Sequence, residues 1–179
     1  MSRTLAATLA ATLLATVSAL AYSRDLPNGW RFPTAEELPD AARDRGPDKE
    51  ARARGDFNGD GTEDEAVLLK STGFSGEALW VWLSKGADGH EWLKLHEINW
   101  GPAYPSVDLA MGVATMPPGV HPYGCFCDAK TECNFGPHDK RPKLRLRDPA
   151  IAYFKIESSG SAYFWSRSRQ RFLCVHTSD

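Results

Sequence analysis

The sequence lacks the short motifs that usually mark an enzyme. Its five histidines stand apart, at positions 90, 96, 121, 138 and 176, and none belongs to a zinc-helix or triad motif. No serine lies in a nucleophile-elbow context, and no glycine-rich loop is built to cradle a phosphate. Glu91, Glu97 and Glu157 could supply the paired carboxylates of a glycosidase, but nothing singles them out. We therefore expect a protein that is not an enzyme, with a secreted hydrolase kept as an alternative.

After residue 21 the chain also lacks an apolar run long enough to span a membrane. At the start, Arg3 precedes a run of mainly Ala, Leu, Val and Thr from Leu5 to Leu20, and Ala19-Leu20-Ala21 forms a small-x-small site. This pattern predicts a cleaved signal peptide at residues 1–21, followed by a single domain at residues 22–179. We expect a periplasmic or secreted protein that does not span a membrane after cleavage.

The charges are unevenly distributed along the chain. Residues 22–70 hold 8 basic and 12 acidic groups, whereas residues 140–171 hold 9 basic and 2 acidic groups. Lys143, Arg145 and Arg147 alternate with leucines, which predicts a strand with one basic face. Export argues against nucleic acid as the partner, so we expect this face to meet an acidic protein surface or an anionic envelope polymer, if it is more than a solvated strand edge.

Four cysteines, at positions 125, 127, 133 and 174, are expected to form disulfides in an oxidising compartment. Cys125 and Cys127 cannot easily pair with each other along an extended backbone, because their side chains diverge. We favour Cys125 with Cys133 and Cys127 with Cys174. A zinc site formed by Cys125, Cys127, Cys133 and His138 is the alternative.

Short apolar runs separated by Gly, Asp, Ser and Pro predict a mainly β fold, an antiparallel meander of about six to eight short strands. The expected strands are 65–70, 77–83, 91–98, a strand around 143–147, 151–157, 162–166 and 171–176. Thr34 and Glu37 fit a capping box, which predicts one short N-terminal helix within about 34–45. Residues 101–136 contain five prolines, five glycines and three cysteines, so we expect a long disulfide-tied loop region there.

In two of the expected strands, the alternation of side chains predicts which residues share a face of the sheet. In strand 77–83, Leu79, Val81 and Leu83 share one face, and Trp80 and Trp82 share the other. Either both faces of the sheet are covered, or the tryptophan face meets a partner. In strand 91–98 the same alternation places leucines 93 and 95 opposite Trp92, Lys94 and His96.

The run from Asp56 to Asp64 has the spacing of a calcium-binding loop. Asp56, Asn58 and Asp60 occupy positions 1, 3 and 5, the Thr62 carbonyl falls at position 7, and Asp64 stands at position 9. Glycine at position 6 allows the sharp turn, but position 12 is a valine, unlike an EF-hand. The prediction is a Ca²⁺ ion with a structural role; an acidic turn bonded to its own backbone is the alternative.

This loop, Gly55 to Gly61 with Asp64 and the apolar run 66–69, resembles the FG-GAP and related VCBS-like calcium loops of integrin-type β-propellers. With the segments 29–34, 152–158, 162–165 and 178–179, the whole chain resembles a family of small periplasmic bacterial proteins that carry one such loop. Calcium-bearing β relatives in bacterial envelopes include immunity proteins that block cell-wall-degrading toxins. The resemblance implies a calcium hairpin and a role of this kind, and it carries over no inhibitory residue.

The leading hypothesis is therefore an exported, non-catalytic calcium-binding β domain that binds a protein, as a periplasmic immunity or inhibitor protein does. Trp80, Trp82, Lys143, Arg145 and Arg147 are the candidate partner-binding residues. A calcium-dependent module for envelope polysaccharides is the alternative from a second class, with Trp80, Trp82 or Trp92 as stacking platforms.

Overall fold

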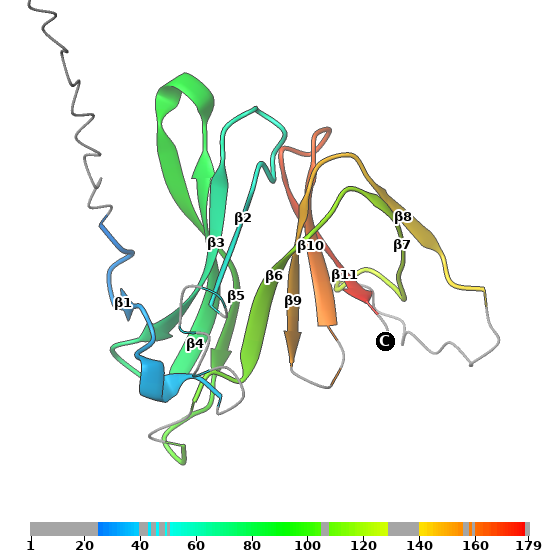
Figure 1. Ribbon diagram of the computed structural model, residues 1–179. Coiled ribbons are helices and arrows are strands. Elements are labelled where there is room, and N and C mark those ends of the chain that lie inside the picture. Colours follow the sequence, from blue (N-terminus) through cyan, green and yellow to red (C-terminus); the bar gives the residue numbers. More distant parts are fainter. Residues whose placement is uncertain are drawn as a thin grey trace, which may run out of the picture.

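Strands make up most of the protein. The structure is a computed structural model and describes residues 25–39, 43, 46, 49, 51–104, 108–128, 140–155, 158 and 160–177. Within these residues, two antiparallel sheets face each other, and a two-stranded ribbon stands beside the second sheet (Figure 1). The expected mainly β class is confirmed.

The first sheet, called sheet A here, is built from the N-terminal half of the chain. Its strands are β1 (Trp30–Arg31), β2 (Arg52–Gly55), β3 (Asp64–Ser71), β4 (Gly76–Ser84) and β5 (His90–Asn99). The last four follow one another as a meander. β1 and β2 lie end to end along the same edge of β3, because β1 pairs with Lys70 and Ser71 while β2 pairs with the first half of that strand.

The second sheet, called sheet B here, has the strand order β11-β10-β9-β6. Its strands are β6 (Met111–Met116), β9 (Ala150–Lys155), β10 (Gly160–Ser166) and β11 (Arg171–Thr177), and the ribbon consists of β7 (Gly119–Pro122) and β8 (Lys143–Leu146). Residues 124–127 extend this sheet beyond β11, since Gly124 donates to the His176 carbonyl at 2.8 Å and Cys127 donates to the Cys174 carbonyl at 3.0 Å.

The core lies between the two sheets. Leu68, Leu79 and Val81 of sheet A and Ile151 of sheet B are all 0% exposed. Burying each of these side chains contributes about 1.5–3 kcal/mol. The alternation in β4 is confirmed, because Leu79 and Val81 face this core while Trp80 and Trp82 lie on the opposite face.

Glu77 joins the two sheets from within the core. Its carboxylate is 0% exposed and accepts hydrogen bonds from the Ala110 and Met111 amides, at 3.1 and 3.2 Å, at the start of β6. Lys70 lies opposite Glu77 on β3. Burial raises the pKa of Glu77, and the amide bonds and the Lys70 charge oppose that rise.

The tryptophan face of sheet A is covered by its own aromatic rings. Trp80 packs edge to face against Trp30 and Trp92, with ring centroids 5.7 and 6.4 Å apart, and Trp82 lies 5.0 Å from Trp92. The N-terminal segment completes the cover, since the Trp92 indole donates to the Asp25 carbonyl at 2.9 Å. This arrangement favours the interpretation that the sheet is covered on both sides.

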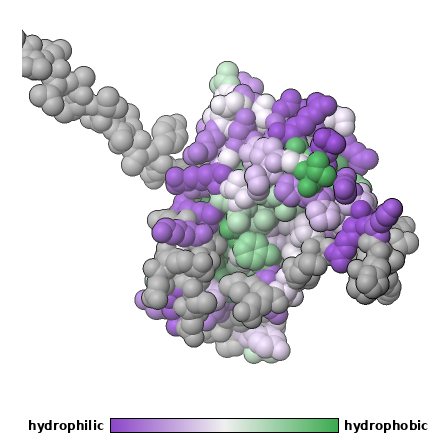
Figure 2. Space-filling model, turned by 45° about the vertical axis from the view of Figure 1, so that its right-hand side comes forward, coloured by the Kyte–Doolittle hydropathy of each residue, from purple (hydrophilic) through white to green (hydrophobic). Residues whose placement is uncertain are grey.

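On the outer face of sheet B, one aromatic ring packs over two glycines of the neighbouring strands. Phe154 of β9 pairs with Gly112 and Gly160, and its ring fills the space a side chain would need at Gly112, where an added Cβ would lie 2.8 Å from it. Figure 2 brings this side of the molecule forward and shows hydrophobic residues lining a hollow between hydrophilic ones.

Several expectations need correction. Strand β6 and the ribbon strand β7 lie inside residues 101–136, which we expected to be a loop region. The short N-terminal helix is a three-residue 3₁₀ turn, Ala35–Glu37, followed by an extended Leu38. Much of the remaining predicted helix lies outside the described residues. The structure also describes eleven strands, more than expected, because β1, β2 and β7 are only two to four residues long.

The face assigned to His96 is wrong. A bulge between Leu79 and Trp80 shifts the register, so that Leu79 pairs with His96 while Trp80 pairs with Lys94. The extra residue in β5 exchanges the two faces of the sheet for the side chains beyond it. His96 therefore points to the core side, where its ring lies 5.2 Å from the ring of Tyr153.

The loop end as candidate functional site

Four turns meet at one end of the sandwich, called the loop end here and located at the top of Figure 1. They are residues 56–63 between β2 and β3, 85–89 between β4 and β5, 147–149 between β8 and β9, and 167–170 between β10 and β11. In an antiparallel meander every second turn lies at the same end of the sheet, which brings the β2–β3 and β4–β5 turns together. Turns on a rigid sandwich are frequent binding sites, which makes the loop end the leading candidate.

Two residues fix the predicted calcium loop to the core. Phe57 is 0% exposed and belongs to the core cluster between the sheets. Asp64 is 1% exposed, and its two oxygens accept hydrogen bonds from the Phe57 amide at 2.7 Å and the Ser84 amide at 2.7 Å. Asp64 therefore ties the loop to the end of β4.

Asp56 and Asn58 turn side-chain oxygens toward the loop's own backbone, and Asn58 also donates to the Ser84 carbonyl at 2.8 Å. The Asp56 carboxylate accepts from the amides of Gly59, Asp60 and Gly61, at 2.8, 3.0 and 2.8 Å. Asn58 accepts from the Asp60 amide at 3.0 Å. Positive φ angles of 73° at Gly59 and 88° at Gly61 allow this tight winding, because glycine adopts them at little cost.

Asp60 continues the same pattern. Its carboxylate accepts from the Thr62 amide at 2.8 Å and from the Asn58 side-chain amide at 3.2 Å. Burial raises the pKa of Asp60, but hydrogen bonds from Thr62, Ser84 and Asn58 together hold it below its ordinary value. The carboxylate is therefore ionised at neutral pH and can serve as a hard oxygen ligand.

The loop fits a cation in part. Asp56, Asn58 and Asp60 bring alternate side-chain oxygens to the inside of one turn, and Ca²⁺ accepts such oxygens together with backbone carbonyls like that of Thr62. Within the described residues, however, no three His, Cys, Asp or Glu side chains converge to hold a metal ion. Asp64 has both oxygens engaged by backbone amides, so only its remaining lone pairs are available to an ion.

Arg167 connects the loop to the hairpin of sheet B. Its guanidinium holds Asp148, with Nη2 3.0 and 2.9 Å from the two carboxylate oxygens, and donates to the Gly59 carbonyl at 3.5 Å. A Cβ at Gly59 would lie 2.1 Å from the same Nη2 atom. The positive φ angle at Gly59 disfavours any side chain there, and the missing side chain also leaves room for the flexible end of Arg167.

A hollow of about 490 Å³ lies between the loop, the turn after β4 and the hairpin tip. Both acidic and cationic residues line it: Asp60, Asp88, Glu91, Lys85 and Arg167. Trp165 lines both this hollow and a smaller pocket below β8.

The predicted partner-binding residues fall in two separate places. Lys143, Arg145 and Arg147 are exposed along β8 and its end, beside the loop end, and none of them has an ion-pair partner among the described residues. Trp80 and Trp82 lie on the outer face of sheet A and are only partly exposed. The structure therefore does not join the basic residues and the tryptophans into one surface.

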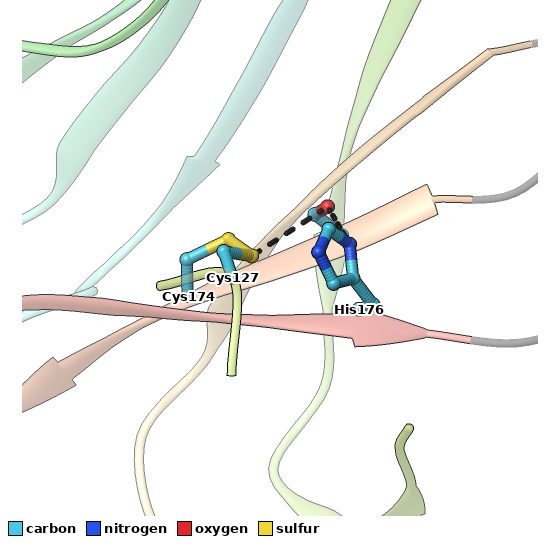
Figure 3. Close-up of a disulfide and its surroundings, with 4 residues drawn as sticks. Cys127, Cys174 and His176 are labelled. Atoms are coloured by element: carbon cyan, nitrogen blue, oxygen red, sulfur yellow. Dashed lines mark hydrogen bonds between the residues drawn. A yellow bond between two sulfur atoms is a disulfide. The ribbon is translucent and has the colours of Figure 1, made fainter. Parts of the chain in front are cut away.

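The predicted Cys127–Cys174 disulfide is present, and it fixes residues 124–127 along β11 (Figure 3). Cys125 is also disulfide-bonded, so neither Cys125 nor Cys127 is free to bind the alternative zinc ion. Cys133 and His138 lie outside the described residues.

Beside this disulfide, Ser161 Oγ lies 3.4 Å from His176 Nδ1 and 3.9 Å from Cys127 Sγ (Figure 3). A nucleophile–base pair needs a third group that orients the histidine. In the described part of the chain, no carboxylate is bonded to His176. The pair supports no specific reaction.

Sequence reasoning missed Asp148, Arg167 and Trp165 as parts of the loop end. Arg167 stands 108 residues after Gly59, and no local sequence pattern predicts a contact between residues so far apart in the chain. The only available signal was the basic composition of the hairpin tip.

Comparison with protein-family models, with curated proteins and with solved structures finds no match to this chain. The resemblance to FG-GAP-like calcium loops therefore rests only on the residues of this sequence. In the part of the chain that the structure describes, no helix is both long and apolar enough to cross a membrane.

Proposed function

We propose that this chain is an exported, non-catalytic calcium-binding domain that binds a protein partner through the loop end, in the manner of a periplasmic immunity or inhibitor protein. The observation that carries the proposal is the convergence of four turns around the loop 56–64, with Arg167 linking that loop to the hairpin of sheet B. Three hairpin turns and the β8–β9 corner offer varied side chains on a rigid support, which suits recognition of a protein surface.

Calcium has a structural role in this proposal. Asp56, Asn58 and Asp60 supply oxygens, the Thr62 carbonyl adds another, and Asp64 fixes the loop to β4. An ion in this position holds the turn 56–63 in one conformation beside Arg167. Removal of the ion then weakens partner binding without removing any residue that contacts the partner.

Polysaccharide recognition by the tryptophans receives less support. Trp80, Trp82 and Trp92 pack edge to face or tilted against one another, and His90 stacks on Trp82 at 5.3 Å, so neighbouring side chains already contact the rings that a sugar would need.

The test is capture from envelope extracts. The full chain, expressed with its own leader and a C-terminal affinity tag, is incubated with extract in calcium or in chelator, and retained proteins are identified by mass spectrometry. We expect one protein retained in calcium and lost in chelator, and also lost with Asp60→Ala. Glu63→Ala is the matched control, because Glu63 is an exposed acid of the same loop with no hydrogen bond in the described residues. If nothing is retained in either condition, or if only peptidoglycan or polysaccharide is, the proposal fails.

A further inference from the structure

A small pocket lies under the end of β8, next to the loop end. It has a volume of about 280 Å³ and is enclosed by the β8–β9 corner and the β10–β11 hairpin. The residues on which the argument rests are Arg145, Arg147, Arg167, Asp148, Phe164 and Trp165.

The pocket carries excess positive charge. Three arginines line it against one acidic residue, Asp148, whose carboxylate is already held by Arg167 through Nε at 3.2 Å and Nη2 at 2.9 Å. Arg145 and Arg147 are exposed and have no ion-pair partner among the described residues. Their guanidinium groups are therefore available to an anion, and arginine binds carboxylates through paired N–H donors.

Apolar side chains form the rest of the pocket lining. Phe164, Trp165 and Pro149 line it together with the buried Phe57. Its volume of about 280 Å³ is just below the range of about 300–1,000 Å³ typical of small-molecule sites. A single side chain with a hydrocarbon stem and an anionic end fits this combination better than a free anion, which would leave the aromatic walls without a contact.

We propose that this pocket receives an acidic side chain, Asp or Glu, of the protein partner, with Arg145 and Arg147 binding its carboxylate and Trp165 packing against its stem. This inference rests on the proposed function and adds to it the chemical character of the partner. The pocket opens beside Arg167, which also contacts the calcium loop, so the partner's acidic residue lies next to the part of the surface that calcium orders.

The test uses two short capped peptides of sequence Gly-Phe-Glu-Phe-Gly and Gly-Phe-Gln-Phe-Gly. They are titrated into the ¹⁵N-labelled full chain, recovered after export, and the Trp165 indole and arginine Nε signals are followed by NMR. We expect the Glu peptide to shift these signals saturably and the Gln peptide to bind at least about tenfold more weakly. Arg145→Ala and Arg147→Ala should each weaken the Glu peptide by about tenfold, since each removes one charged hydrogen-bond partner.

Lys143→Ala is the matched control, because Lys143 precedes Arg145 by two residues on the same face of β8 and does not line the pocket. It should change the affinity by less than about twofold. Equal binding of the Glu and Gln peptides, equal effects of Lys143→Ala and Arg145→Ala, or displacement of the peptide by an equal concentration of inorganic phosphate would each overturn the proposal. If a partner is captured from extract but Arg145→Ala and Arg147→Ala leave its retention unchanged, the pocket assignment fails while the proposed function stands.

Discussion

At the loop end, the carboxylates of Asp56, Asp60 and Asp64 accept hydrogen bonds from backbone amides of the fold, whereas Arg145 and Arg147 have no ion-pair partner in the described residues. Arg167 donates to the Gly59 carbonyl in the acidic loop and lines the same pocket as Arg145 and Arg147. The acidic side chains are therefore part of what holds the turn together, and the basic ones contribute little to the fold. A change among the acids should alter stability, and a change among these bases should alter binding.

The largest effect is expected at Asp64. Asp64→Ala leaves the buried amides of Phe57 and Ser84 without their acceptor, and each unsatisfied buried group costs about 1–3 kcal/mol. We expect the free energy of unfolding to fall by about 3 kcal/mol in urea denaturation. Glu63→Ala, next to it and exposed, should stay within about 0.5 kcal/mol of the wild type. Equal losses for the two variants would show that the loop is not anchored through Asp64.

Calcium should have the next largest effect. An ion bound only by the folded chain stabilises it by about 2.7 kcal/mol at a free concentration one hundred times its dissociation constant. Calorimetric melting in calcium and in chelator measures this difference, with magnesium as the ionic control. Asp60→Ala should abolish it and Glu63→Ala should preserve it. A melting temperature that does not respond to calcium would remove the metal from the proposed function.

Glu37 lies outside the loop end and is paired with Arg31. It tests whether charged groups with a partner in the fold contribute to stability. The hydrogen bond from Arg31, at 2.6 Å, together with the Thr34 amide and the Arg31 charge, lowers the pKa of Glu37 to about 2. Because the folded-state pKa is depressed, its contribution to stability is present above the ordinary glutamate pKa of about 4.3 and is lost as pH falls toward 2.

The expected size of the Glu37 contribution is about 1 kcal/mol, since the Arg31 side chain is 43% exposed and solvent screens the pair. Unfolding of the wild type and of Glu37→Gln is compared between pH 7 and pH 2. The difference should shrink steadily as the pH falls. A difference that stays constant over this range would assign the Glu37 effect to packing alone.

The smallest effect on stability is expected for Arg145 and Arg147, which have no ion-pair partner in the described residues. Arg145→Ala combined with Arg147→Ala should change the free energy of unfolding by no more than about 0.5 kcal/mol, because exposed groups without partners contribute little. Thermal melting measures this. A loss of several kcal/mol would mean that these arginines support the fold, and the contrast between the two regions would disappear.

Local patterns predicted the longer strands well, because their side chains alternate between core and surface. Strands β3, β4 and β5 and strands β9 to β11 all fall close to their expected positions. Strand β2, with the sequence RARG, has too few apolar residues to be recognised and is a strand only because β3 pairs with it. The face of His96 could not be predicted either, since a bulge leaves no reliable trace in the sequence.

The sequence by itself determined the mainly β class and the leucine and valine face of β4, because these depend on alternation along a few residues. It also placed Gly59 and Gly61 where the loop 56–64 needs positive φ angles. Only the tertiary structure decided that Asp64 is buried against Ser84, that Arg167 reaches Gly59, and that Arg145 and Arg147 border a pocket with Trp165. These contacts join residues from different hairpins, so they depend on how the two sheets pack and not on the order of neighbouring residues.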